Sequence, residues 1–144
     1  MKAFLDTSVL VATFYADHEH HQPSIELFLR FGKSDACCAA HSLAEVYATL
    51  TAMPPPRRVS GDQALLFLGN IREQLALVAL NEQEYVEVTE GAAASGLAGG
   101  AIYDAILGQC ALKIDAEVIY TWNKHDFLRL PQSIAARVKT PDAV

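Results

Sequence analysis

The stretch Lys2-Ala3-Phe4-Leu5-Asp6-Thr7-Ser8 is the first in this sequence to join an apolar strand to a polar turn. Its apolar part, residues 2–5, predicts a short buried strand, and its polar part predicts a turn into a helix. The side chains of this turn can cap the apolar segment that follows, at residues 9–15. The stretch therefore predicts a strand–turn–helix unit with Asp6 at the carboxyl end of the strand.

The rest of the chain repeats this alternation of strands and helices. Apolar runs predict further strands at about residues 36–40, 75–80 and 117–121, with a weaker one at about 137–140. Helices are expected at about residues 23–31, 42–52, 60–75, 81–96 and 101–113. Such alternation predicts an α/β fold: a three-layer α/β/α arrangement with a central parallel sheet of four to five strands. Ligand sites in these sheets form beyond the carboxyl ends of the strands.

Four carboxylates lie far apart in the sequence but fall where this fold would gather them at one edge of the sheet. They are Asp6, Glu45, Asp104 and Asp126. Carboxylates a few ångströms apart cannot all stay ionised unless protons or a cation neutralise them. A divalent metal is the simplest neutralising group, so the pattern predicts a metal site.

Each of these acids also has a purely structural interpretation. Asp6 can cap the helix that follows it, and Asp126 can cap a turn. Glu45 can complete a capping box with Ser42, three residues earlier. Asp104 can be an acid that the helix dipole favours in the first turn. However, its helix also carries small residues near it, which predicts close packing there rather than free solvation.

Length and composition fit one domain, residues 1–144, with 51% apolar residues and enough chain to bury a core. Apolar runs such as residues 75–80 are far shorter than the roughly 20 residues of a membrane helix. Asp6 interrupts the first apolar stretch, so we expect no signal peptide and a cytoplasmic protein. The cysteines lack the spacing of zinc ligands, and we expect reduced core thiols at Cys37, Cys38 and Cys110.

The net charge of −6 argues against a protein that coats nucleic acid, which would normally carry a basic stripe. Removing the four negative charges of the candidate site leaves −2, and a bound cation would reverse the sign of the local field. Charge therefore does not exclude a phosphate-containing substrate. The cations that we expect to make weak phosphate contacts are Arg57, Arg58, Lys124 and Arg129.

Other chemistries lack a matching motif. The histidines at 18, 20 and 21 lie in a polar segment, which favours a solvated loop over a metal site. The glycines do not form a Walker or Rossmann phosphate loop, and there is no Gly-x-Ser-x-Gly elbow. A haloacid-dehalogenase-like phosphatase also begins with an aspartate at a strand end, but it needs a second aspartate where this chain has Ser8.

Four motifs, in this order, resemble those of PIN-domain ribonucleases, and in particular the toxins of VapBC-type toxin–antitoxin pairs. The first is Phe-Leu-Asp6-Thr-Ser, and the second is His-Ser-Leu-Ala-Glu45 after the second strand. The third is Tyr-Asp104-Ala, and the fourth is Thr121-x-Asn-x-x-Asp126-Phe. Together they span nearly the whole chain.

The resemblance implies a Mg²⁺- or Mn²⁺-dependent endoribonuclease that leaves 5′-phosphate and 3′-hydroxyl ends. Asp6, Glu45 and Asp104 match three acidic positions of the family. Family members often carry an aspartate where this chain has Asn123, so the fourth position stays open between Asn123 and Asp126. Residues expected to support the site are Thr7, Ser8, Thr121 and Asn123. A cation held by carboxylates can activate water directly, so no nucleophilic side chain is required.

The resemblance also implies a homodimer and an antitoxin whose C-terminal segment lies in a groove leading to the acids. Residues 64–80 carry more apolar side chains than one core-facing stripe needs, so we expect the excess to pack against another chain. The alternative is a monomer that buries these residues itself. Two alternative functions remain on the same fold: a housekeeping RNA-processing nuclease and a non-catalytic binding module.

Overall fold

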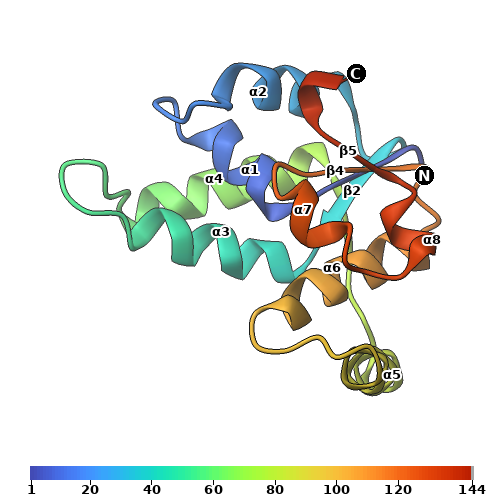
Figure 1. Cartoon of the computed structure of the whole chain (residues 1–144). Helices are drawn as coiled ribbons and strands as arrows, with labels where there is room; N and C mark the ends of the chain where they lie inside the picture. The colour runs from blue at the N-terminus through green and yellow to red at the C-terminus, as the bar shows by residue number, and fades with distance from the viewer. Residues whose placement is uncertain (144) are drawn as a thin grey trace.

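The computed structural model describes residues 1–143 and shows a five-stranded parallel sheet between two layers of helices (Figure 1). The strand order is β3-β2-β1-β4-β5, and all four pairings are parallel. The strands are β1 Ala3–Leu5, β2 Ala36–Ala39, β3 Ala76–Val78, β4 Val118–Tyr120 and β5 Val138–Lys139. The predicted α/β/α architecture is confirmed, including the weak fifth strand.

Within residues 1–143, four helices pack on each face of the sheet. The first layer comprises α1 Thr7–Phe14, α2 His21–Arg30, α3 His41–Thr51 and α4 Gly61–Gln74. The second comprises α5 Glu82–Ala94, α6 Ala101–Lys113, α7 Lys124–Phe127 and α8 Gln132–Ala135. Figure 1 shows α5 outside α6, and a 3₁₀ turn, Pro141–Ala143, follows β5. The short helices α7 and α8 were not predicted.

Each face of the sheet has its own hydrophobic core, because neighbouring residues of a strand point to opposite faces. In β1, Phe4 packs beneath α5–α8, whereas Leu5 packs beneath α1–α4. Cys37 and Cys38 divide between the two cores in the same way. All three cysteines are free and buried, and burial raises the pKa of the Cys37 and Cys38 thiols to about 12. The prediction of reduced core thiols is therefore confirmed.

The helix starts follow the predicted turn chemistry, with one exception. The Asp6 side chain caps α1 by accepting a hydrogen bond from the Ser8 N–H, and Ser60 caps α4 in the same manner. A capping box is present at Asn81, where α5 begins. The capping box predicted for Glu45 is absent, because α3 begins two residues too early and has no side-chain cap. Glu45 is therefore not held by its own helix start.

The second helical layer depends on a close approach at Gly108. A methyl group at this position of α6 would lie 2.9 Å from Ile134 Cδ1 of α8, closer than real contacts allow. The small residue thus lets α8 lie directly on α6. This observation agrees with the close packing predicted for the helix that carries Asp104.

Part of the apolar surface of α4 stays uncovered. Leu65 and Leu66 are 60% and 70% exposed, whereas Ala64 and Ile71 are buried. The sequence analysis left open a monomer that buries all apolar side chains of residues 64–80 itself. For Leu65 and Leu66 that alternative is wrong, because a single chain leaves both exposed. In residues 1–143, no helix combines the length and apolar character needed to cross a membrane.

Candidate active site

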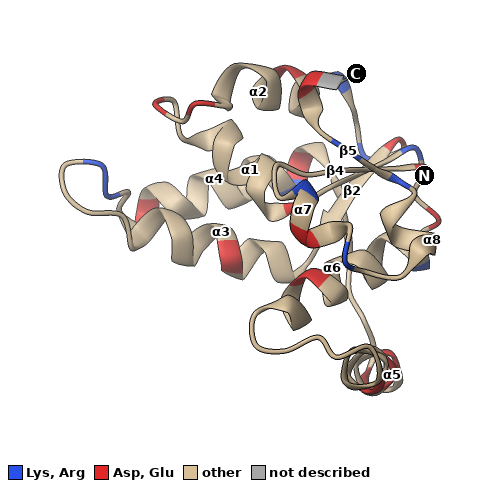
Figure 2. Cartoon of the chain, viewed as in Figure 1, with Lys and Arg blue, Asp and Glu red and all other residues tan. Residues whose placement is uncertain are grey.

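A cavity of about 430 Å³ opens beyond the carboxyl ends of β1 and β4, and three of the four predicted acids line it. Asp6 directly follows β1, Glu45 lies on α3, and Asp104 lies in the first turn of α6. Figure 2 shows acidic positions on α3, α6 and α7 around this part of the molecule. The parallel sheet thus brings together carboxylates that are far apart in the sequence.

Asp6 is held rigidly at the bottom of the site. Its backbone N–H donates to the Tyr120 carbonyl of β4, at 2.9 Å. Its Oδ2 atom accepts hydrogen bonds from Thr121 Oγ1 and Ser8 Oγ, both at 2.7 Å. Burial raises the pKa of the Asp6 carboxyl, although these hydrogen bonds oppose the change. Two predicted supporting residues therefore orient this acid.

Glu45 is oriented from another helix. Thr7 Oγ1 lies 3.0 Å from Glu45 Oε1 and 2.8 Å from Ser42 Oγ, and it donates its single proton to one of them at a time. His41 Nε2 lies 3.9 Å from the same carboxylate oxygen. Burial raises the pKa of Glu45, the Thr7 hydrogen bond and His41 oppose it, and the charge of Asp6 adds to it. The hydroxyl of Thr7 thus links α1 to α3 at the site.

Asp104 shows the mutual repulsion of the acids most clearly. Burial raises its pKa to about 6, and the charges of Asp6, Asp126 and Glu45 contribute in the same direction. Arg129 opposes them. Asp104 thus lies within the electrostatic influence of the three other candidate acids. Such perturbed carboxyl groups concentrate at functional sites.

The two candidates for the fourth position lie differently. Asn123 lines the cavity, and its backbone N–H donates to Thr121 Oγ1 at 2.9 Å. Asp126 lies on α7 outside the cavity lining, and its Oδ1 is 3.5 Å from Arg129 Nη2. Asp126 is nevertheless close enough to raise the pKa of Asp104. Its charge therefore reaches the site, although its side chain does not line the cavity.

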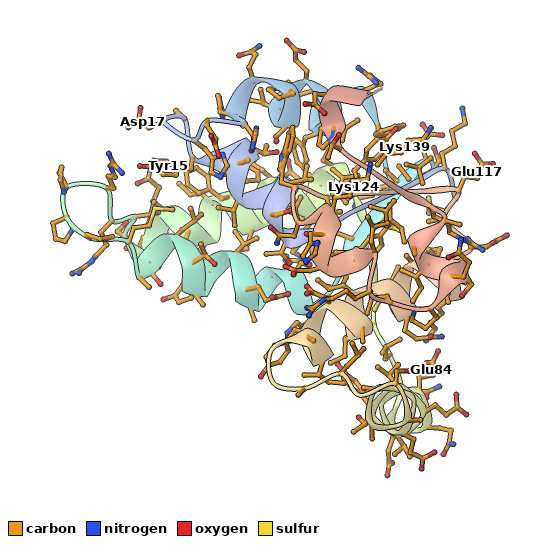
Figure 3. The ribbon with its side chains drawn as sticks, viewed as in Figure 1. Tyr15, Asp17, Glu84, Glu117, Lys124 and Lys139 are labelled. Atoms are coloured by element: carbon orange, nitrogen blue, oxygen red, sulfur yellow. The ribbon has the colours of Figure 1, made fainter. Side chains whose placement is uncertain are left out.

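The four candidate phosphate-binding cations divide into two groups. Lys124 is the first residue of α7, and Arg129 follows the helix and acts on the pKa of Asp104; Figure 3 shows Lys124 near the centre of the molecule. Arg57 and Arg58 lie in the loop between α3 and α4, at the outer end of both helices (Figure 2). Arg58 Nε donates to the Met53 carbonyl at 3.1 Å. None of these four cations lines the cavity, but Arg129 is close enough to Asp104 to lower the pKa of that acid.

Sequence reasoning missed one wall of the cavity. His18, Glu19 and His20, between α1 and α2, line it together with Trp122, which follows β4. The predicted loop is present at residues 15–20, and His18 and His20 are half-buried within it. The one signal in the sequence was an aromatic residue placed directly after the end of a central strand.

The donor set fits a hard divalent cation, but its side chains are not arranged around one. Within residues 1–143, no three acidic, histidine or cysteine side chains stand together in positions to hold a metal ion. Asp6, Glu45 and Asp104 nevertheless line one cavity, and Asp6 raises the pKa of the other two. Mg²⁺ prefers carboxylate oxygens, and a cation between these groups would relieve their repulsion.

The fold and this acidic cavity agree with the sequence comparisons. The model of the PIN-domain family matches residues 3–132, and the chain belongs to that family. The protein is 34% identical over 114 residues to Ribonuclease VapC40 of Mycobacterium tuberculosis, a match that covers 79% of this chain and 81% of VapC40.

Similar solved structures have the same fold at low sequence identity. The sarcin–ricin-loop-cleaving toxin VapC20 of M. tuberculosis has a TM-score of 0.68 at 14% identity, and the match covers 94% of each chain. A chain of VapBC-1 from nontypeable Haemophilus influenzae has a TM-score of 0.67 at 18% identity over 99% of each chain. One from Rickettsia felis VapBC2, bound to promoter DNA, has a TM-score of 0.65 at 17% identity over 97% of this chain and 98% of that one.

Proposed function

We propose that this protein is a divalent-metal-dependent endoribonuclease and the toxin of a VapBC-type toxin–antitoxin pair. The observation that carries the proposal is the convergence of acids on Asp104, whose pKa is raised to about 6, in the cavity of a PIN domain. The 34% identity to a named ribonuclease, VapC40, supports the activity. We further propose a single domain over residues 1–144 that acts in the cytoplasm.

Asp6, Glu45 and Asp104 are the residues that would hold Mg²⁺ or Mn²⁺. The bound cation supplies a water of lowered pKa and neutralises charge on the scissile phosphate. Ser8 and Thr121 fix the orientation of Asp6, and Thr7 fixes that of Glu45. These hydroxyl contacts hold two carboxylates ready, so less ordering is needed when substrate binds.

Asn123 is the better candidate for the fourth position, because it lines the cavity and Asp126 does not. A neutral amide there adds an oxygen ligand without adding negative charge. Asp126 would then act through its charge on Asp104, together with Arg129. Lys124 and Arg129 would then attract the RNA backbone.

The proposed partner is a VapB-type antitoxin. Two similar structures are VapBC complexes by name, which supports a partner of this kind. A cationic antitoxin side chain placed among the acids would compete with metal, because it satisfies the same clustered charge. A small gene immediately upstream that encodes such a protein would separate this proposal from a housekeeping nuclease.

The direct test is cleavage of RNA by purified protein with Mg²⁺, Mn²⁺ or EDTA. Wild-type protein should cleave with either metal and lose activity in EDTA, and Asp6→Asn should be inactive. Glu117→Gln is the matched control, since Glu117 is exposed at the other edge of the sheet (Figure 3). Sequencing RNA 5′ ends after brief induction of wild type and Asp6→Asn would locate the cleaved bonds. Equal cleavage by wild type and Asp6→Asn would refute the assignment.

A further inference from the structure

We propose that one face of the Trp122 indole binds an unpaired nucleobase of the RNA substrate by stacking, and that His20 covers this face in the free protein. The inference rests on the proposed ribonuclease function and specifies how its substrate is held. It assigns a binding role to a residue outside the acidic cluster.

Trp122 is fixed in place at both ends. Its backbone N–H donates to Ser8 Oγ at 3.0 Å, and its indole Nε1–H donates to the buried Ser24 Oγ at 2.8 Å. Ser8 Oγ also donates to Asp6 Oδ2, at 2.7 Å. The Ser8 hydroxyl therefore connects the Trp122 backbone to the acid at the bottom of the site. This connection sets a constant separation between a stacking surface and the place where phosphate is cleaved.

His20 shows that the indole face accepts a flat nitrogen heterocycle. Its imidazole lies parallel to the indole, with ring centroids 3.8 Å apart and an interplanar angle of 8°. This is the geometry of a base stacked on an aromatic side chain. The two hydrogen bonds of Trp122 use its backbone N–H and the Nε1–H at the edge of the indole. The flat face of the indole is therefore available to stack on this ring.

The imidazole is held less firmly than the indole. The His20 ring lies 3.5 Å from Glu19 Oε1, a carboxylate that is 82% exposed, and such surface pairs contribute little. The hydrogen bonds that hold His20 in this loop use its backbone: its N–H donates to His18 Nδ1 at 3.0 Å, and its carbonyl accepts from the Ser24 N–H at 3.2 Å. The ring can therefore rotate away without breaking those bonds. A nucleobase can then take its place on the indole.

The position of Trp122 in the cavity favours binding of a base from a single-stranded segment of RNA. Trp122 and Asn123 line the same cavity as Asp6, so a nucleotide whose phosphate lies at the acids has its base near this wall. A base within a duplex is already stacked on its neighbours and cannot present a face to the indole. Stacking tolerates any base, because each has a π-face. The site thus selects unpaired RNA rather than one sequence.

The experiment uses the fact that Trp122 is the single tryptophan of the chain. Its fluorescence is recorded while short single-stranded oligoribonucleotides bind, with Ca²⁺ in place of Mg²⁺ to prevent cleavage. A set of matched oligonucleotides carries one abasic residue at each position in turn. We expect quenching by the intact oligonucleotide and loss of quenching at one abasic position. Unchanged fluorescence with every oligonucleotide that binds would overturn the inference.

Cleavage kinetics in Mg²⁺ provide the second measurement. Trp122→Ala should lower kcat/KM on the intact oligonucleotide about 5-fold or more. It should have little further effect on the oligonucleotide that is abasic at the critical position, because the two changes remove the same contact. Tyr85→Ala is the control, an exposed aromatic residue on α5 away from the cavity. Independent, multiplicative losses would show that Trp122 has only a structural role.

His20→Ala tests whether the imidazole covers the face. Binding should stay equal or become tighter in this variant, whereas a loss as large as that of Trp122→Ala would contradict the covering role. If wild-type protein neither binds nor cleaves any oligonucleotide, the proposed function fails together with this inference. If it cleaves normally and neither the abasic scan nor Trp122→Ala has an effect, only this inference fails.

Discussion

The carboxyl group of Asp104 should make the free energy of unfolding depend on pH. Its carboxyl has a pKa raised from 3.8 to about 6, chiefly by burial and then by three acidic neighbours. Between these two values the folded protein holds a proton that the unfolded chain has released. Stability without metal should therefore fall as pH rises from about 4 to 6, and stay lower above that range.

Asp104→Asn should remove this dependence. At pH 7.5 in EDTA we expect the variant to be more stable than wild type by about 1–2 kcal/mol, a value reduced from the full pKa shift because the group is only half-buried. At pH 4.5 the difference should shrink, since wild-type Asp104 is then largely protonated. Urea unfolding of wild type and variant at the two pH values measures both stability differences. A stability difference that does not change with pH would contradict this account.

Glu45 should matter for activity rather than for helix stability. Because α3 has no capping box, Glu45→Gln should lower kcat/KM about 100-fold and change stability by less than about 1 kcal/mol. The contrasting variant is Glu84→Ala, which breaks the capping box that starts α5 and the ion pair between Glu84 and Lys113 of α6. That variant should melt at a lower temperature and keep full activity. Full activity in Glu45→Gln would remove this residue from the site.

At the scale of the elements, the contact between α6 and α8 depends on one missing side chain. Gly108→Ala should destabilise the protein by about 1–3 kcal/mol, because the added methyl meets Ile134 at 2.9 Å. Gly69→Ala is the matched control: Gly69 lies inside α4, and no atom lies within 4 Å of an added methyl. It should stabilise the protein by about 0.5–1 kcal/mol through helix propensity. Denaturant unfolding of both variants tests the pair, and equal effects would contradict the close approach.

At the scale of the whole molecule, the exposed leucines of α4 predict association. We expect light scattering at micromolar concentration to give a mass near twice the single-chain 15.6 kDa, as the sequence analysis predicted for a homodimer. Leu66→Glu, at a side chain 70% exposed, should shift the mass toward the monomer without unfolding the chain. A mass of one chain for the wild type, unchanged on concentration, would exclude the dimer.

Most of the fold could be predicted from local sequence, because strand and helix signals act over a few residues. The bounds of α6, Ala101–Lys113, follow from the glycines before it and the helical spacing within it. The caps at Asp6, Ser60 and Asn81 follow from turn chemistry. The short helices α7 and α8 were missed, since four residues are too few to show a helical period.

The sequence by itself determined which acids are available and that parallel strands would bring them to one sheet edge. Only the tertiary structure decided how they are held. Thr7 rather than Ser42 orients Glu45, Asn123 rather than Asp126 lines the cavity, and His20 covers Trp122. These outcomes depend on how helices pack and on side-chain rotamers, and they join residues as far apart as Trp122 and Ser24. Local periodicity carries no information about such contacts, because it specifies a residue's face but not the neighbour that the face meets.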